Sequence, residues 1–376
     1  MKIALITLHR IVNYGSVLQT YATQFILEKM GHTVEVVDYC DERMTLMGML
    51  RRIKTKRIAL SKPIVCQIAQ LVMLPSYIKR FYIFWSFLKK NIHLTKKKYS
   101  SFEQLQKDTP VADCYCTGSD QVWNSVWNEK VDKVFFLDFI PDGKPCFAYA
   151  ASFGKNELDL REIDITKNLL KKYGLLSCRE LQGTKILKEL GYDSECVLDP
   201  TLLLNQEDWE TLVSKRFENK KYIFVYNLNR SKEIDVAAKI LSKELNIPVY
   251  TVSYCYHEIP SRQGKVFVNP CIEDFLSLIA NACYVLTDSF HATAFSINFS
   301  RQVFVYYPDQ FSSRLTSIVE MAGIQHHIAK NKNILELIQQ PIDYSCVHLM
   351  LNPVRNKSLL FLEKALKYAK QTAHSN

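Results

Sequence analysis

The chain has 376 residues, of which 48% are hydrophobic and 23% are charged, so a disordered or fibrous chain is excluded and the length suits two domains. The formal net charge is +10, from 48 Lys and Arg against 38 Asp and Glu. Fourteen of the basic residues lie in the segment 43–98, which has no Asp or Glu, and the remainder has 34 basic against 38 acidic residues. The sequence therefore describes a mildly acidic globule with one concentrated basic segment.

The predicted elements begin with a strand at 3–8, a helix at 16–30 that stops at Gly31, and a strand at 33–38. Residues 44–98 carry apolar side chains at helical spacing, without β-branched alternation, and are predicted to be helical. The first series continues with strands at 111–116, 134–136, 146–150 and 175–178, a helix at 181–190 and a strand at 196–198.

The chain breaks at Asp199-Pro200, because proline fixes its own φ and restricts the residue before it. A second series follows, with strands at 222–226, 249–253, 284–287 and 303–306 and helices at 232–244, 272–282 and 290–299. Two such series predict two Rossmann-like, doubly wound α/β domains that face each other across a cleft.

The domain boundaries follow from this break. We expect an N-terminal domain at 1–200 that carries a basic helical insert at 43–98, and a C-terminal domain at 201–352. The last segment, 353–376, holds a predicted helix at 357–372 that we expect to pack back on the first domain.

The eleven cysteines have irregular spacing, with no CxxC pair and no Cys/His cluster of zinc type, which indicates free thiols in a reducing cytosol. The N-terminus reaches His9 after only a short apolar run, so it predicts a strand and not a signal peptide. The longest apolar stretch, 63–75, is too short to span a bilayer. We expect a cytoplasmic protein, soluble or peripheral at the inner face of the membrane.

Several motifs of common enzyme classes are absent, which limits the reactions that the chain could catalyse. The glycines include no GxG pair, so the chain has neither a dinucleotide fingerprint nor a P-loop. No two aspartates lie two residues apart, so a DxD-type metal site for nucleotide-sugar chemistry is also missing. These absences disfavour a nicotinamide oxidoreductase and an NTPase, and they predict no metal ligands.

Three polar loops follow predicted strands, at 13–16, 117–121 and 288–291. In open α/β sheets ligands bind at the carboxyl ends of strands, and backbone N–H groups at a helix N-terminus favour an anion. Ser16 and Ser289 are also suitable N-caps, and capping alone would explain them. By spacing alone, each loop is better explained as a structural turn.

These loops belong to a wider set of motifs. They are Asn13-Tyr14-Gly15-Ser16-Val17-Leu18-Gln19, Gly118-Ser119-Asp120-Gln121-Val122-Trp123-Asn124, Tyr149-Ala150-Ala151-Ser152-Phe153-Gly154, Ser177-Cys178-Arg179-Glu180, Leu198-Asp199-Pro200-Thr201-Leu202 and Thr287-Asp288-Ser289-Phe290-His291. Together, and in this order, they resemble the polysaccharide pyruvyl transferase family. The chain departs from the family pattern at Ala292, where glycine is usual, and at Ser312-Ser313-Arg314, where Asn-Ser-Arg is usual. The basic segment 43–98 matches no family motif.

The resemblance implies a GT-B-like arrangement, with the acceptor side in the first domain and the donor side in the second. It also implies transfer of pyruvate from phosphoenolpyruvate to a sugar, as a cyclic ketal, with no cofactor. The donor carries a carboxylate and a phosphate, so its site needs cations and helix-end amides. Arg179 is a candidate to bind it and act in catalysis, although an ion pair with Glu180 would also explain this residue. The other donor-site candidates are Ser289, Phe290, Ser313 and Arg314.

His291 is the leading catalytic candidate. Ketal formation needs a proton delivered to the donor and another removed from an attacking hydroxyl, and histidine suits both tasks near neutral pH. A helix N-terminus lowers the pKa of a histidine, whereas bound phosphate raises it, so the sequence leaves its resting state open. An ordinary turn histidine is the alternative.

The acceptor-site candidates are Asn13, Tyr14, Gln19, Ser119, Asp120, Gln121 and Trp123. Asp120 and Gln121 have the right groups to hydrogen-bond sugar hydroxyls, while a helix start and core packing are alternatives for Asn13, Tyr14 and Gln19. Trp123 and Trp127, four residues apart, suggest a stacking face for a sugar ring, with paired core aromatics as the alternative.

The basic segment 43–98 mixes cations with bulky apolar residues, a pattern that suits an anionic membrane surface bearing a lipid-linked glycan acceptor. A solvated basic face over an ordinary core stripe fits equally well, and no motif supports nucleic acid. Two other functions remain open: a metal-independent GT-B glycosyltransferase that uses a nucleotide sugar, and a non-catalytic glycan-binding protein.

Overall fold

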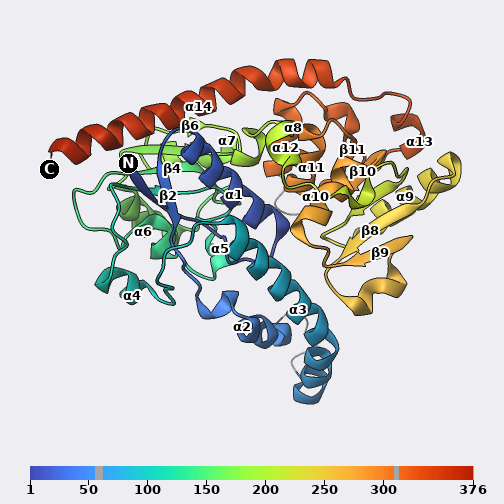
Figure 1. The fold of residues 1–376 in the computed structure, drawn as a ribbon, viewed down its shortest axis with the longest axis horizontal. Coiled ribbons are helices and arrows are strands. Elements are labelled where there is room, and N and C mark those ends of the chain that lie inside the picture. The colour runs from blue at the N-terminus through green and yellow to red at the C-terminus, as the bar shows by residue number, and fades with distance from the viewer. Residues whose placement is uncertain (56–61, 309–312, 376) are drawn as a thin grey trace.

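The computed structural model of the protein describes residues 1–55, 62–308 and 313–375. Within these residues the strands form two sheets, and every strand pair is parallel. The first sheet has the order β2-β1-β3-β4-β5-β6 and the second the order β11-β10-β7-β8-β9. Figure 1 shows the two sheets side by side, each with helices around it.

The strands of the first sheet are β1 (Lys2–Ile6), β2 (Thr33–Val36), β3 (Cys114–Thr117), β4 (Cys146–Ala151), β5 (Leu175–Cys178) and β6 (Glu195–Cys196). Those of the second are β7 (Ile223–Tyr226), β8 (Val249–Ser253), β9 (Lys265–Val268), β10 (Tyr284–Thr287) and β11 (Gln302–Val305). Ile3 and Leu5 of β1 pack in one apolar cluster, while Ala4 and Ile6 pack in another. This alternation shows that helices cover the first sheet on both faces, as in doubly wound folds.

The helices before residue 200 are α1 (Tyr14–Lys29), α2 (Leu46–Arg51), α3 (Pro63–Asn91), α4 (Phe102–Lys107), α5 (Ser125–Asn128), α6 (Leu160–Leu170) and α7 (Leu181–Glu189). Those after it are α8 (Gln206–Glu210), α9 (Lys232–Leu245), α10 (Ile272–Ala280), α11 (Phe290–Asn298), α12 (Ser313–Met321), α13 (Ile334–Leu337) and α14 (Tyr344–Ser375). Asn13 caps α1, since its side chain accepts from the backbone N–H groups of Gly15 and Ser16.

The helical prediction for 44–98 is confirmed for α2 and α3 but is wrong over 92–98, and residues 56–61 lie outside the described chain. After α3 the backbone runs along the edge of β2: the N–H of Val36 donates to His93 at 2.7 Å, and the N–H of Thr95 donates to Val36 at 2.9 Å. This edge offers unpaired backbone groups, and satisfying them outweighs the helical pattern of the side chains.

The predicted strand at 134–136 is also wrong, because these residues form a 3₁₀ turn, Lys133–Phe136. Asp132 caps the turn, and Leu137 ends it with a φ of +57°. The three apolar side chains are buried, and a short buried run has no periodicity that separates a strand from a turn. The sequence also missed α6 and β9.

Helix α14 starts at Tyr344, thirteen residues before the predicted start at 357, and continues through Pro353. Figure 1 shows it as the long red helix that runs along both sheets. Ser358 accepts a hydrogen bond from the N–H of Leu198 at 2.9 Å, and the ring of Phe361 lies 6.3 Å from that of Tyr149 in β4. The helix therefore starts beside the second sheet and packs on the first.

None of the helices in the described ranges combines the length and apolar character that a bilayer crossing requires.

Candidate functional site

The loops at the carboxyl ends of the two sheets meet around a cavity of about 400 Å³. The lining residues come from the loops after β1, β3, β7 and β10 and from the start of α12. They are Leu8, Ile11, Asn13, Ser16, Asp120, Gln121, Asn124, Val126, Trp127, Leu228, Asn229, Asp288, Ser289, Phe290, His291, Pro308, Arg314 and Leu315. This is the edge at which open α/β sheets bind ligands.

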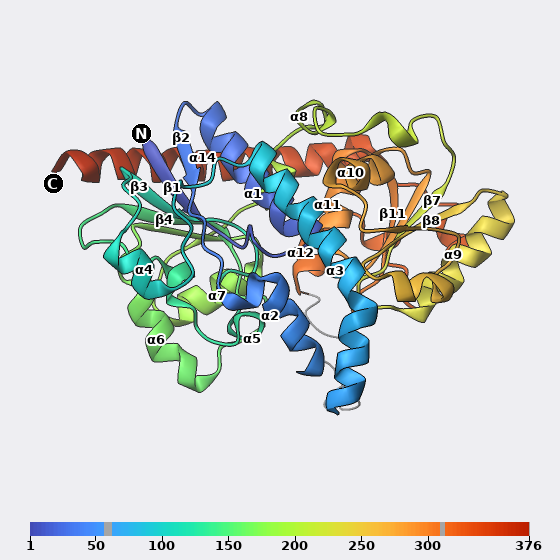
Figure 2. The same cartoon turned by 60° about the horizontal axis from the view of Figure 1, so that its bottom comes forward.

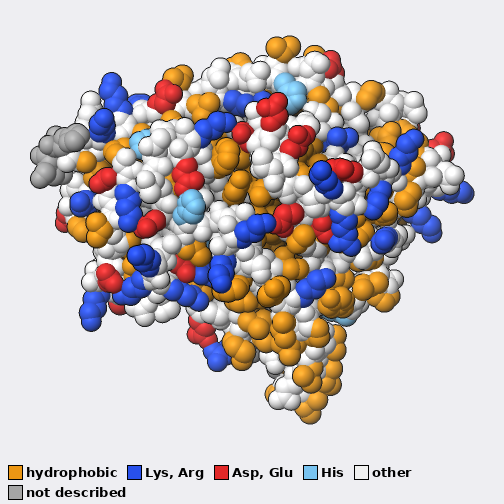
Figure 3. Space-filling model, in the orientation of Figure 1, with side chains coloured by type: hydrophobic (Ala, Val, Ile, Leu, Met, Phe, Trp, Pro, Cys, Tyr) orange, Lys and Arg blue, Asp and Glu red, His pale blue; other side chains and the backbone are white. Residues whose placement is uncertain are grey.

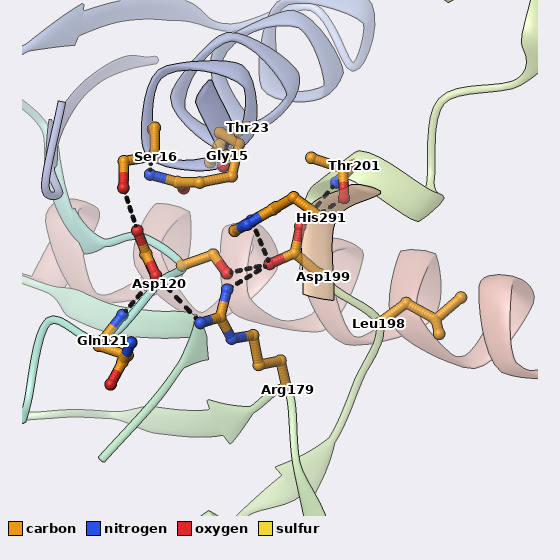
Figure 4. Close-up of polar contacts among 12 residues, drawn as sticks. Gly15, Ser16, Thr23, Asp120, Gln121, Arg179, Leu198, Asp199, Thr201 and His291 are labelled. Atoms are coloured by element: carbon orange, nitrogen blue, oxygen red, sulfur yellow. Dashed lines mark hydrogen bonds and ion pairs between the residues drawn. The ribbon is translucent and has the colours of Figure 1, made fainter. Parts of the chain in front are cut away.

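His291 lies in the first turn of α11, which Ser289 caps by accepting from the N–H of Ala292 at 3.3 Å. Its ring fills the space beside Gly15 of α1, where an added Cβ would lie 1.9 Å from the Nδ1 of His291. Only glycine at this position allows α1 and α11 to approach so closely. Figure 4 shows the ring between Gly15 and Asp199.

The His291 imidazole is 7% exposed, and its Nε2 lies 3.9 Å from Oδ2 of Asp199. Among the described residues this Nε2 has no hydrogen-bond partner. Burial lowers the pKa of His291 to about 4 and outweighs the carboxylates of Asp199 and Asp120, which act to raise it. The imidazole is therefore neutral at pH 7, and its buried, unbonded Nε2 faces the Asp199 carboxylate.

Arg179 lies behind the cavity and is fully buried. Its terminal nitrogens donate to Asp199 at 2.8 Å and to Asp120 at 3.0 Å, and its guanidinium lies 4.9 Å from the ring centre of Phe290. Burial alone would lower the pKa of Arg179, but the carboxylates around it have the larger effect, so the pKa is raised. Arg179 does not line the cavity, so its side chain is not placed to contact a donor directly.

The two aspartates that Arg179 bridges come from different loops of the first sheet. Asp120 has a φ of +79° and accepts from the hydroxyl of Ser16 at 2.6 Å, while Asp199 accepts from the hydroxyl of Ser119 at 2.8 Å. Burial would raise the pKa of each carboxyl, but Arg179 and the other partners hold both pKa values below the usual range. The result is an ionised, hydrogen-bonded support beneath His291 (Figure 4).

Arg314, near the start of α12, is the one Lys or Arg among the described residues that line the cavity. With the amide oxygen of Gln121 turned toward it, both terminal nitrogens donate to that oxygen at 3.2 Å, and its Nε has no partner among the described residues. Burial lowers the pKa of Arg314 to about 10, so it remains a cation at pH 7. It is placed to meet an anion.

The cavity brings together about half of the residues that the sequence singled out. Asn13, Asp120, Gln121, Ser289, Phe290, His291 and Arg314 line it, whereas Tyr14, Gln19, Ser119, Trp123, Arg179 and Ser313 do not. Ser312 lies outside the described residues.

The acceptor-site candidates that do not line the cavity have structural roles. Tyr14 is buried, donates its hydroxyl to Pro270 at 2.7 Å, and stacks on Phe275 with the ring centres 4.1 Å apart. Gln19 donates its amide to Thr7 at 2.8 Å. The Trp123 indole donates to the backbone of Phe135 at 3.2 Å. Tyr14 thus joins the two domains, Gln19 and Trp123 are held inside the first, and all three side chains are buried away from the cavity.

The sequence paired Trp127 with Trp123 as a stacking face, and of the two Trp127 lines the cavity, whereas other lining residues were missed. Trp127 is half exposed at the cavity, away from the buried Trp123, because a new helix starts at Asn124 between them. Asp288 accepts from the backbone N–H groups of Leu228 at 2.7 Å and Asn229 at 2.8 Å, and so holds the β7 loop at the cavity. Asn124 and Asp288 are in the quoted motifs, whereas nothing in the sequence pointed to Leu228 or Asn229.

One group of described side chains has the spacing of metal ligands: Cys255, His257 and Glu258. It lies outside the cavity, and Glu258 is already bonded to Arg230 and Arg262 at 2.5 Å and 2.8 Å.

Two doubly wound α/β domains with a cleft between their carboxyl edges define a GT-B-like fold. The chain is similar to the UDP-N-acetylglucosamine 2-epimerase from Neisseria meningitidis bound to UDP-N-acetylglucosamine, with a TM-score of 0.54 and 15% identity over 98% of this chain and 100% of that one. It is also similar to a protein from Listeria monocytogenes described as a UDP-N-acetylglucosamine 2-epimerase, with a TM-score of 0.54 and 10% identity over 98% and 97% of the chains. Such low identities show the fold alone.

No curated protein matches the chain significantly in sequence. The family model for polysaccharide pyruvyl transferases matches residues 13–310, which is most of the chain. The protein therefore belongs to the polysaccharide pyruvyl transferase family and is a transferase.

Proposed function

We propose that the protein transfers pyruvate from phosphoenolpyruvate to two hydroxyls of one sugar, forming a cyclic ketal and releasing phosphate. The observation that carries this proposal is the neutral His291 imidazole, which has an unbonded Nε2 and shares a cavity wall with the cation Arg314. Family membership supports the reaction class.

The donor is a small dianion or trianion, and the cavity has matching groups. Arg314 offers charged N–H donors for a carboxylate or phosphate. The N-terminus of the nine-residue helix α11 adds backbone N–H groups with a favourable dipole. A negative charge bound here raises the pKa of His291 from its low resting value, which prepares the imidazole to take up a proton.

In the net reaction two C–O bonds form at the central carbon of the donor, while its bond to the phosphate oxygen and the π bond to the methylene carbon break. Two hydroxyl protons leave the sugar: one ends on the methylene carbon, which becomes a methyl group, and the other leaves with phosphate. In our proposal the His291 imidazole accepts a hydroxyl proton and passes it on. Asp199, 3.9 Å away, stabilises the imidazolium formed in between.

Arg179 is a positioning residue in this proposal. By bonding Asp120 and Asp199 together it fixes the carboxylate that faces His291.

The acceptor binds on the side of the cavity formed by the first domain. Asn13 and Gln121 offer amide groups to sugar hydroxyls, and the half-exposed Trp127 offers an apolar ring for stacking. We propose that this acceptor is a lipid-linked polysaccharide precursor.

The test is phosphate release from phosphoenolpyruvate with a panel of lipid-linked glycans. The wild type should release phosphate only with an acceptor present, and His291→Gln should reduce turnover by about 10²–10⁴-fold, the usual contribution of a general acid–base. His326→Gln, at an exposed histidine outside the cavity, should keep full activity. Near-normal turnover of folded His291→Gln would remove His291 from the mechanism.

A thermal-shift experiment separates the alternatives. Protection by phosphoenolpyruvate supports the proposal, whereas protection only by a nucleotide sugar would indicate a GT-B glycosyltransferase. Glycan binding with no phosphate release from any donor would indicate a non-catalytic protein.

A further inference from the structure

Helix α3 presents an apolar face to solvent. Ile64, Ile68 and Leu71 are 72%, 57% and 69% exposed, and the same face continues through Val72 and Ile78. Tyr82 and Trp85 extend it toward the end of the helix. In Figure 3, hydrophobic side chains cover the lower projection of the molecule, where Figure 1 places the start of α3. We call Ile64, Ile68, Leu71, Val72, Ile78, Tyr82 and Trp85 the α3 face. A contiguous apolar surface of this kind marks an interaction site.

The opposite side of α3 is packed, so the orientation of the helix is fixed. Phe84 and Phe87 are buried, and Tyr77 belongs to a small core with α2. The Lys79 amine donates to the backbone of Val268 at 2.7 Å, which ties the helix to the second domain. Figure 2 shows α3 passing between the domains and projecting beyond both. The apolar face is therefore held outward and cannot turn inward without breaking this packing.

The surroundings of the α3 face are cationic. The sequence from 43 to 98 has fourteen basic residues and no acid, and Lys62 and Lys89 are exposed on α3 or at its start. Lys90 is also exposed, and its amine lies 3.9 Å from the carboxylate of Glu273 in α10. The amine of Lys89 lies 5.3 Å from the ring centre of Trp85. Exposed Trp and Tyr beside lysines are typical of the level of lipid headgroups.

We propose that the α3 face docks on an anionic lipid surface, with its apolar side chains at the headgroup boundary and its lysines on the headgroups. The charge favours this occupant over a second copy of the chain, since two copies would bring two cationic segments together. The helix lies on the surface and does not cross it, in agreement with the hydropathy of the described helices.

Docking deepens the proposed function, because a lipid-linked acceptor lies on the same surface. Helix α3 also packs on the helix that borders the cavity: the ring of Phe84 lies 5.0 Å from that of Tyr14 in α1, the chain neighbour of Gly15, which lies beside His291. One rigid helix therefore connects the proposed membrane contact to the proposed active site.

The test is cosedimentation of the full chain with vesicles of phosphatidylcholine containing 30% phosphatidylglycerol, at low salt. The wild type should bind these vesicles at least tenfold more tightly than pure phosphatidylcholine, and salt should weaken the binding. The triple change Ile64→Ser, Ile68→Ser and Leu71→Ser should weaken it at least tenfold. All three side chains are exposed, so the fold should survive.

The matched control changes three exposed apolar residues elsewhere, Leu160→Ser, Val236→Ser and Leu360→Ser, and should bind vesicles like the wild type. A wild type that does not bind anionic vesicles overturns the proposal, as does a triple variant that binds equally well. If the wild type is a dimer and the triple change makes it a monomer, the α3 face instead binds a second copy of the chain, which overturns the proposal. Binding does not depend on turnover, so vesicle binding without phosphate release would refute only the proposed function.

Discussion

At the scale of single residues, His291 shows how burial decides a charge state. Two carboxylates, Asp199 and Asp120, act to raise its pKa, yet burial and the cations Arg179 and Arg314 lower it to about 4. A neutral imidazole can accept a proton from a hydroxyl, whereas an imidazolium cannot. Arg179, hydrogen-bonded to both aspartates, offsets their negative charge and so weakens their stabilisation of an imidazolium.

This charge state predicts a pH-dependent stability. The folded pKa of His291 is about 4, below its usual value of 6.5, so the unfolded chain takes up a proton first as the pH falls. The free energy of unfolding should therefore decrease between about pH 6.5 and pH 4, by about 2–3 kcal/mol at pH 4.5. His291→Gln should lack this component. Urea unfolding at pH 7.5 and 4.5 measures it, and equal pH dependence in both proteins would contradict a buried neutral histidine.

At the scale of elements, the site depends on two helix starts that meet. Asn13 caps α1 and Ser289 caps α11, and both caps place a helix N-terminus at the cavity. The sequence identifies Ser289 as a cap, because its residue type and the following helical spacing are local signals. It is wrong about Ser16, which lies inside α1, because the helix begins earlier and Asn13 caps it. It does not show that the two N-termini touch, since Gly15 and His291 are 276 positions apart. That contact depends on how the domains pack.

The contact predicts a double-mutant result. Gly15→Ala places a methyl group within the His291 ring, so it should cost about 1–3 kcal/mol by overpacking. His291→Ala removes the ring, and in that background Gly15→Ala should cost close to nothing. Denaturant unfolding of the four proteins gives the coupling energy. Additive costs would show that the two helices do not approach each other in this way.

At the scale of the whole molecule, α14 joins the domains. It starts after the second sheet, and its later turns pack on the first, where Phe361 is buried against Tyr149 and Ser358 bonds the backbone of Leu198. The strand-bearing parts of the chain lie on either side of residue 200, so this helix returns the C-terminus to the first domain. Its packing fixes one domain relative to the other and, with them, the two walls of the cavity.

Loss of the packing of α14 on the first sheet should lower the free energy of unfolding. Phe361→Ala should destabilise the protein by about 3–5 kcal/mol, the usual cost of truncating a buried Phe, and should lower the midpoint of thermal unfolding. Leu360→Ala, at the exposed neighbour, is the matched control and should leave that midpoint nearly unchanged. Equal effects of the two changes would mean that α14 does not pack as described.

The sequence by itself determined the two βα series, the GT-B-like class and the family, because alternating strands, helix caps and six short motifs are local features. It also located His291 and Arg314. Only the tertiary structure decided that Arg179 is buried between two aspartates and that Tyr14 and Trp123 belong to the core. It also showed that α3, within the segment of fourteen basic residues, is a long helix with an outward apolar face. The physical reason is the same in each case: residue type and spacing encode secondary structure, whereas the exposure and charge state of a side chain depend on neighbours that are distant in the sequence.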